Sequence, residues 1–211
     1  MKRRSMVWLT CTCMVATLGW GQPLLAAGNA ADWVSEVMRR MDNSEVIRGD
    51  FEQTKSVKGF KKPLVSRGQF LMAKGRGVQW LTQTPFASQL IVTRDRMTTI
   101  TDGGTQQLDA RQEPGLRAIN ELLMAVLGGD LRVLAARFDI TGTVSGPHGW
   151  SMVLVPKDAT LARFISRIEM EGAQHVQLVR LTEGNGDGSL IRFAHQRGDD
   201  HLTAAEQATF N

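Results

Sequence analysis

The sequence of 211 residues predicts an α+β protein whose core is an incomplete antiparallel β-barrel, a strongly curved sheet with an N-terminal helix and a helical lid. Two observations predict this class. The spacing of apolar residues changes from helical to every second residue at Val46, and the period of two then continues through several short runs. A single helical stretch, between Pro114 and Arg137, interrupts those runs. Because strands and helices do not alternate, the class is α+β and not α/β.

The first predicted element is a helix from Asp32 to Met41, with Asp32 as its N-cap. Its apolar face consists of Trp33, Val34, Val37, Met38 and Met41. The strands that follow alternate apolar and polar residues, and Gly, Pro or polar turns bound them. The apolar pairs are Phe70 and Met72, Val78 and Trp80, and Leu90 and Val92. Asp102-Gly103-Gly104 predicts a hairpin turn.

The helical interruption comprises two predicted helices. Pro114-Gly115 opens the first and Gly128-Gly129 closes it, while Asp130 caps the second, which runs from Leu131 to about Arg137. Strands then resume over Trp150 to Val155, Phe164 to Glu171, Gln174 to Leu181 and Ser189 to Ala194. Hairpin loops are expected around Gly172 and from Glu183 to Gly188, and a polar tail ends the chain.

The N-terminus predicts export. Lys2, Arg3 and Arg4 precede an apolar run from Met6 to Trp20, and the small residues after it offer a cleavage site. This run is too short for a membrane span, and Thr and Gly interrupt it. We therefore predict that residues 1–28 are a signal peptide and that residues 29–211 form a single periplasmic domain.

Removal of the predicted signal peptide changes the number of cysteines and the net charge of the chain. Both cysteines, Cys11 and Cys13, lie within it, so the mature chain can form no disulfide or thiolate metal site. Three basic residues leave with it, and 22 basic residues then face 21 acidic ones. The pI of 9.4 mostly describes the precursor. We therefore expect no nucleic-acid binding and no general basic patch.

The residues that could carry out chemistry are scattered. The histidines (His148, His175, His195 and His201) occupy a turn, strand ends and the tail without i, i+4 spacing, so we expect solvated side chains and not metal ligands. No nucleophile elbow, phosphate loop or dinucleotide fingerprint occurs. Glu183 to Gly188 matches the start of a calcium loop, but Ala194 stands where a bidentate glutamate belongs. We predict that the protein is not an enzyme and binds no metal or cofactor.

The helix from Leu116 to Leu127 is rich in large apolar residues, which cover more than one narrow stripe. They are Leu116, Ile119, Leu122, Leu123, Met124, Val126 and Leu127. Such a helix is either buried core or a lid over an apolar cavity, and the sequence leaves both open. A carrier of acyl chains needs a dry and pliable cavity, because moving about 16 carbons into water costs on the order of 13 kcal/mol.

The segment from Gly49 to Val92 contains Phe51-Glu52-Gln53, a strand pair ending in Trp80, and Thr84-Pro85, and Leu154-Val155-Pro156-Lys157 follows later in the chain. In these motifs the chain resembles the periplasmic outer-membrane lipoprotein carrier family, as a divergent branch. The resemblance implies a half-barrel whose apolar cavity and lid hold acyl chains. In this chain the implied residues are Phe70, Met72, Trp80, Leu90, Val92, Leu116, Ile119, Leu122, Leu123 and Met124. It also implies a basic gate that bonds the lid, which either Lys74 or Arg76 would supply.

The resemblance further implies a monomeric periplasmic carrier of acylated cargo. Such a carrier takes lipoproteins or other lipidated cargo from an inner-membrane export complex to an outer-membrane acceptor. An alternative is a periplasmic regulatory protein that senses lipid or lipoprotein, since similar half-barrels occur in envelope-stress regulators that carry an additional domain. A third class, a lipid hydrolase, lacks a recognisable nucleophile and base in this sequence.

Overall fold

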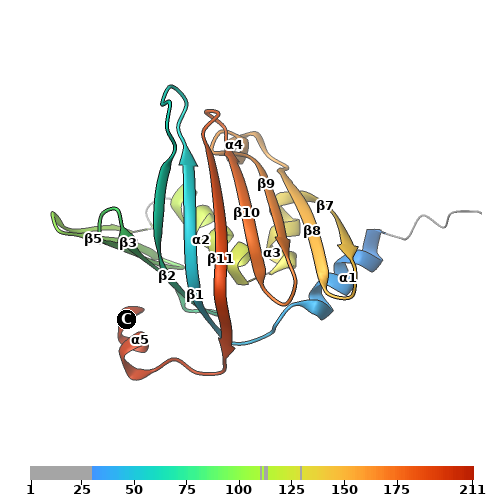
Figure 1. Cartoon of the computed structure of the whole chain (residues 1–211), viewed down its shortest axis with the longest axis horizontal. Helices are drawn as coiled ribbons and strands as arrows, with labels where there is room; N and C mark the ends of the chain where they lie inside the picture. Colours follow the sequence, from blue (N-terminus) through green and yellow to red (C-terminus); the bar gives the residue numbers. More distant parts are fainter. Residues whose placement is uncertain (1–29, 110, 112–113, 129) are drawn as a thin grey trace, which may run out of the picture.

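A computed structural model describes residues 30–109, 111, 114–128 and 130–211, and the predicted signal peptide lies outside them. The strands form one antiparallel sheet in the order β6-β5-β4-β3-β2-β1-β11-β10-β9-β8-β7 (Figure 1). They are β1 (Val46–Ser56), β2 (Leu64–Ala73), β3 (Gly77–Thr84), β4 (Ser88–Thr93), β5 (Arg96–Thr101), β6 (Gly104–Asp109), β7 (Phe138–Ser145), β8 (Gly149–Pro156), β9 (Ile165–Gly172), β10 (Val176–Glu183) and β11 (Gly188–Asp199). The helices are α1 (Ala30–Arg40), α2 (Pro114–Gly128), α3 (Leu131–Arg137), α4 (Ala159–Ala162) and α5 (Ala204–Thr209).

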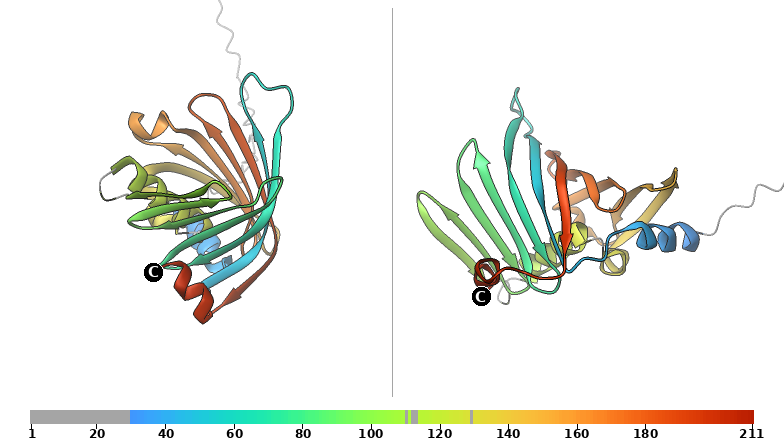
Figure 2. Two further views of the ribbon diagram at one scale, coloured as in Figure 1. Left: turned by 90° about the vertical axis from the view of Figure 1, so that its left-hand side faces the viewer. Right: turned by 60° about the horizontal axis from the view of Figure 1, so that its bottom comes forward.

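Most neighbouring strands follow each other in sequence, so the sheet consists of two meanders of hairpins. β1 and β11 join the meanders, with Phe51 opposite Phe193 and Gln53 opposite Ile191. β6 and β7 are the two edges of the sheet, and α2 and α3 lie between them in the chain. The sheet curls without closing (Figure 2), which confirms the α+β class and the incomplete antiparallel barrel.

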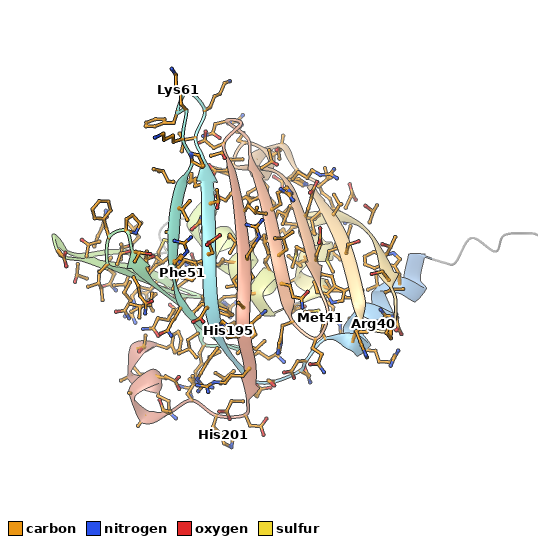
Figure 3. All side chains as sticks on the ribbon, viewed as in Figure 1. Arg40, Met41, Phe51, Lys61, His195 and His201 are labelled. Carbon is orange, nitrogen blue, oxygen red and sulfur yellow. The ribbon has the colours of Figure 1, made fainter. Side chains whose placement is uncertain are left out.

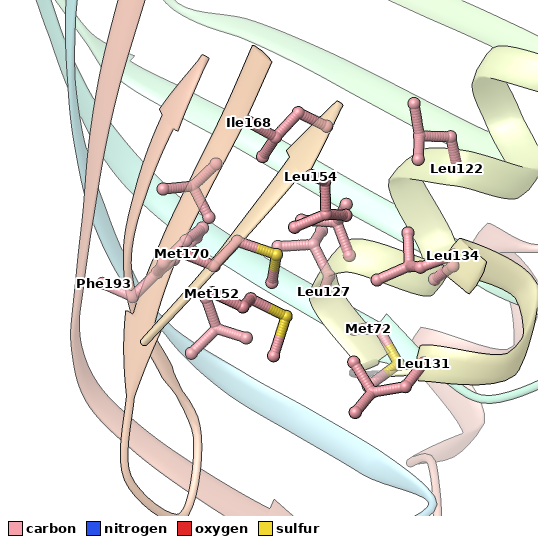
Figure 4. Close-up of a cluster of buried hydrophobic side chains, with 14 of the residues drawn as sticks. Met72, Leu122, Leu127, Leu131, Leu134, Met152, Leu154, Ile168, Met170 and Phe193 are labelled. Atoms are coloured by element: carbon pink, nitrogen blue, oxygen red, sulfur yellow. The ribbon is translucent and has the colours of Figure 1, made fainter. Parts of the chain in front are cut away.

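The hydrophobic core lies between the concave face of the sheet and the helices α2 and α3. Met152 of β8 and Met170 of β9 are almost fully buried, and in Figure 4 they point toward Leu127 of α2. Leu134 of α3 is fully buried in the same cluster. A curved sheet and a straight helix leave irregular gaps, and the unbranched methionine side chain fills such gaps well.

Helix α1 covers the concave face at the β7 edge. The ring of Trp33 lies against Gly142, where a Cβ atom would come within 2.7 Å of the ring, so this close approach requires glycine. Two predictions for this helix are wrong. The helix begins at Ala30, which places Asp32 inside it and not at its N-cap. Met38 is exposed, because α1 packs mainly on β7 and buries a narrower stripe, centred on Val37.

The C-terminal helix α5 covers part of the convex face, where the sequence predicted only a polar tail. The apolar contacts of this segment join Leu202 and Phe210 to Val46, Leu71 and Ala73. The Arg48 guanidinium donates to both carboxylate oxygens of Glu206 at 2.7 Å. These bonds, with those from Thr203, lower the pKa of Glu206 to about 2. An ion pair and an apolar contact therefore fix α5 on the sheet.

Most of the other predicted elements are confirmed. Asp130 caps α3 by accepting from the N–H groups of Arg132 and Val133, and the turn after Thr101 joins β5 to β6. The sequence prediction misses β7, because Gly142 and neighbouring Thr and Ser residues interrupt its apolar alternation. It also misses the short helix α4, and it ends β11 at Ala194 although the strand continues to Asp199.

Candidate apolar cavity

A cavity of about 240 Å³ lies between α2 and the concave face of the sheet. Fourteen apolar or aromatic residues and one polar residue, Gln53, line it. The lining residues are Gln53, Val78, Trp80, Leu90, Val92, Leu122, Leu123, Val126, Leu127, Ile165, Ile168, Val179, Leu181, Ile191 and Phe193. No ionisable side chain lines this cavity in the described part of the chain, so its chemistry suits hydrocarbon.

The side chains from the strands reach the cavity because residues two apart in a strand lie on the same face of a sheet. The register places Trp80 opposite Leu90 and Val78 opposite Val92, all toward the helices. The polar Gln53 is partnered within the sheet, since its Nε2 donates to the Ser189 hydroxyl at 3.4 Å. One of the two donors of this amide therefore has a partner within the sheet.

An aromatic floor, made of Phe51, Phe70, Trp80 and Phe193, underlies the cavity. Phe51 stacks on Trp80 with ring centroids 3.9 Å apart. Phe193 meets Trp80 edge-on at 6.0 Å and Phe70 at 5.1 Å. Each such contact adds about 1 kcal/mol beyond the burial of area. The sheet side of the cavity therefore combines aromatic rings with aliphatic side chains, whereas the α2 side consists of aliphatic side chains alone.

The structure brings half of the ten predicted cavity residues together. Trp80, Leu90, Val92, Leu122 and Leu123 line the cavity. Phe70 lies in the aromatic floor, and Met72 and Met124 line a separate hollow. Leu116 and Ile119 belong to α2, but their side chains lie outside the described residues.

The lining from β9, β10 and β11 is absent from the sequence prediction. It comprises Ile165, Ile168, Val179, Leu181, Ile191 and Phe193. The alternation of these strands is visible in the sequence. What the sequence does not show is the pairing of β1 with β11, which joins the N-terminal and C-terminal strands into one concave surface.

Asn120 is a polar residue of α2 that sequence reasoning did not single out. It is fully buried, and its Nδ2 donates to the carbonyl oxygen of Thr93, the last residue of β4, at 3.0 Å. Its Oδ1 has no partner among the described residues. A buried amide with an unpaired oxygen loses about 1–3 kcal/mol, which offsets the gain from its one bond. This bond thus positions α2 without holding it strongly.

A second hollow, of about 530 Å³, lies between the C-terminal half of α2 and the β2–β3 turn, where Met72, Met124 and Lys74 line it. Lys74 Nζ donates to the carbonyl oxygen and Oδ1 of Asn43 at 2.7 and 2.8 Å. Arg76 is exposed in the β2–β3 turn. Within the described residues neither of these two side chains bonds α2, and their role as a gate stays a prediction.

The histidines lie away from the apolar cavity. His195 is exposed, as expected, but it lies within β11 and not at a strand end, with Nδ1 2.8 Å from Asp50 Oδ2. His175, expected to be solvated, is largely buried, because the Asp42 N–H donates to the Gln174 carbonyl and draws the β9–β10 loop against α1. Among the residues that the structure describes, no group of three His, Cys, Asp or Glu side chains is arranged to hold a metal ion.

An open half-barrel with an apolar cavity under a helix is the arrangement implied by the sequence resemblance, and a comparison with known families supports that resemblance. The family model for the outer membrane lipoprotein carrier protein LolA matches residues 42–207, a span that contains every described strand as well as α2 and α3. The chain belongs to the LolA family. No curated protein matches this LolA-family sequence. In the described part of the chain, no helix has the length and apolar character to cross a membrane.

Three solved structures are similar to this LolA-family chain at low identity. An outer membrane lipoprotein-sorting protein domain from Vibrio parahaemolyticus is 10% identical, with a TM-score of 0.45, over 87% of this chain and 100% of that one. A LolA superfamily protein from Nitrosomonas europaea is 7% identical, with a TM-score of 0.47, over 86% and 97%. MucB is 13% identical, with a TM-score of 0.46, over 85% and 62%.

Proposed function

We propose that this LolA-family protein is a periplasmic carrier that binds the acyl chains of lipoproteins or other lipidated cargo and shuttles them from the inner to the outer membrane. The observation that supports the proposal most is the lining of the α2 cavity. Its walls are apolar except for one partnered glutamine, Gln53, and among the described residues no charged group reaches them. A hydrocarbon chain is the ligand that such a surface binds.

The cavity is small for the proposed cargo. Its volume of about 240 Å³ is below the roughly 300–1,000 Å³ of pockets that enclose small-molecule ligands. A chain of about 16 carbons, which costs on the order of 13 kcal/mol to expose to water, needs more room. In the proposed carrier, helix α2 would therefore move away from the sheet when cargo enters.

Movement of α2 exchanges one set of apolar contacts for another. The side chains of Leu122 and Leu123 face the same strands that the acyl chain would contact. Because methylene groups of the cargo replace leucine methyl groups against these strands, the apolar area kept from water changes little. The polar cost of opening is small, because the Asn120–Thr93 hydrogen bond is worth about 1 kcal/mol and the unpaired Oδ1 of Asn120 offsets it. A low cost of opening permits both uptake and release.

The other parts of the proposal come from the sequence. Residues 1–28 would direct export, and residues 29–211 would form the single mature domain. The carrier would be a monomer that receives cargo from an inner-membrane export complex and passes it to an outer-membrane acceptor. Phe70, Met72 and Met124, with Leu116 and Ile119, would join the binding surface once α2 has moved. Lys74 or Arg76 would gate the lid.

The test is native mass spectrometry, with lipid extraction, of protein purified from the periplasm. We expect acyl-bearing species to copurify with the wild-type protein. Replacing Leu90, at the cavity wall, with tryptophan fills the cavity and should remove them. The matched control is Val155→Trp, because Val155 of β8 is exposed on the opposite face of the sheet and its replacement leaves the cavity open.

Each outcome distinguishes between the candidate functions. Acyl species in the wild type and in Val155→Trp, but not in Leu90→Trp, would support the carrier. A copurifying protein without any lipid would support the periplasmic regulator in place of the carrier. Equal lipid content in all three proteins would show that lipid binds elsewhere on the chain and would contradict the assignment of this cavity.

A further inference from the structure

The hairpin between β1 and β2 projects beyond the neighbouring strands (Figure 1). Its ladder ends where Lys55 faces Leu64, so residues 56–63, here named the hairpin tip, extend past the last cross-strand pair. A turn shapes this tip, since the Phe60 N–H donates to the Val57 carbonyl oxygen at 3.0 Å. Gly59 has a φ of +93°, a left-handed conformation that glycine adopts without strain.

The hairpin tip combines an exposed aromatic ring with three cations. The side chain of Phe60 is 71% exposed, and Leu64 at the base of the tip is 60% exposed. Lys58, Lys61 and Lys62 are also exposed, and Figure 3 shows Lys61 at the outermost point of the hairpin. An amphipathic tip of this kind presents both an apolar group and positive charge to the same partner.

Ion pairs neutralise the cations below the tip, whereas among the described residues no ion pair involves the side chain of Lys58, Lys61 or Lys62. Lys55 pairs with Glu183 at 2.9 Å, and Arg67 pairs with Glu52 at 2.7 Å. No acidic residue occurs between Lys55 and Arg67 in the sequence. The nearest contact from an acid is that of Asp187, whose Oδ1 accepts from the backbone N–H of Lys58. The net charge of the mature chain is near zero, yet its distribution leaves the tip strongly basic.

The hairpin tip lies at the same end of the strands as one end of the cavity. This end, here named the rim, contains the end of β1, the start of β11, the end of β10 and the start of β9. The strand register places Ser56 beside Gly188, Thr182 beside Gly188, and Glu183 beside Ile165. Ile165 and Leu181 line the cavity within a few residues of this rim. Two further exposed phenylalanines, Phe86 and Phe164, lie at connections on the same rim.

We propose that the hairpin tip docks this protein on an anionic lipid surface, with Phe60 in the interface and the three lysines against the head groups. Single exposed apolar residues are common on soluble proteins and alone indicate nothing. Here the ring stands among three lysines in a segment whose own sequence has no acid, with Asp187 as the one acidic contact, and this positive charge complements an anionic bilayer. The inference rests on the proposed carrier for its purpose, because docking by this rim would bring the cavity close to the membrane.

The test measures sedimentation of the full mature chain with vesicles of phosphatidylcholine, with and without phosphatidylglycerol. Each lysine near an anionic surface strengthens binding about fivefold. The double variant Lys61→Glu and Lys62→Glu should therefore bind the anionic vesicles at least about 25-fold more weakly. Phe60→Ser should weaken binding as well, and high salt should weaken the wild type. The matched control reverses Arg132 and Arg197, which are exposed on α3 and β11.

The outcomes distinguish membrane docking by the hairpin tip from binding of cargo in the cavity. Binding that is lost in the Lys61/Lys62 variant and kept in the Arg132/Arg197 control would support the proposal. Equal loss of vesicle binding in the Lys61/Lys62 variant and in the Arg132/Arg197 control would show a general charge effect and overturn the proposal. A wild-type protein that does not bind anionic vesicles would also overturn it. If the wild-type protein does not bind vesicles and the Lys61/Lys62 variant no longer transfers cargo, the tip would bind a protein acceptor and not a membrane. Binding of an apolar probe in the same samples reports the cavity separately.

Discussion

Replacing Leu123 with glutamate should remove most binding of an apolar fluorescent probe while the fold remains. Leu123 is a partly buried residue on the α2 side of the cavity. Burial of a leucine is worth about 1.5–3 kcal/mol, and part of this would be lost from the complex. A carboxylate beside a bound hydrocarbon also loses hydration, which costs several kcal/mol more unless it turns away. We therefore expect affinity to fall at least tenfold, which corresponds to about 1.4 kcal/mol.

The fold should survive because a partly buried carboxylate on α2 can turn toward solvent. Probe titration, far-ultraviolet circular dichroism and thermal unfolding would be recorded on the same preparations. Leu122→Glu is the destabilised comparison, since Leu122 is buried in the core, and Val155→Glu on the convex face should change neither property. Loss of the fold together with probe binding in Leu123→Glu would show that α2 is ordinary core and would refute the lid.

The Arg48 guanidinium lowers the pKa of Glu206 from 4.5 to about 2, so the stability from this pair is complete above pH 4.5 and is lost as the pH falls toward 2. Glu206→Gln should cost roughly 1 kcal/mol of unfolding free energy at neutral pH and flatten the acid part of the profile, as measured by urea unfolding. Neutralising the gate, whether by Lys74→Leu or by Arg76→Leu, should slow handover of a labelled acylated protein more than its loading, because the charged donor would no longer favour the closed cavity. Wild-type rates in both variants would exclude the gate. Reductant and chelator should leave the melting temperature of the mature chain unchanged, and a shift of several degrees with chelator would reveal a metal site.

Local patterns in the sequence were sufficient for most of the fold. Alternation identified the strand faces that carry Trp80, Leu90 and Val92, and a proline start with a double-glycine end bounded α2. These signals depend on neighbours in the chain, and single-sequence reasoning captures them well. The edge strand β7 was not predicted, because most of its residues are exposed at the open side of the barrel, where an apolar residue is not required.

The candidate site was less predictable because it depends on distant pairing. Nothing local indicates that Gln53 lies opposite Ile191, yet this register places the C-terminal strands beside the aromatic floor. Asn120 was overlooked for a similar reason, since a polar residue on an apolar helix becomes meaningful only when the Thr93 carbonyl is found beside it. For Lys74, the sequence resemblance suggested a role as a gate that bonds the lid. In the structure its ammonium group instead donates to Asn43.

The position of α2 in the topology would let the proposed cavity change in volume while the sheet stays intact. The backbone ladders run from β6 to β7 without involving any helix, so they stay intact when a helix moves. The apolar concave face of a wide, unclosed barrel needs other side chains to cover it, and here the side chains of α2 and α3 pack against it. Packing between aliphatic groups is not directional, and an acyl chain can replace it. The aromatic floor belongs to the sheet and the aliphatic contacts belong to α2, so in the proposed carrier uptake of cargo would change the volume of the cavity without unfolding the protein.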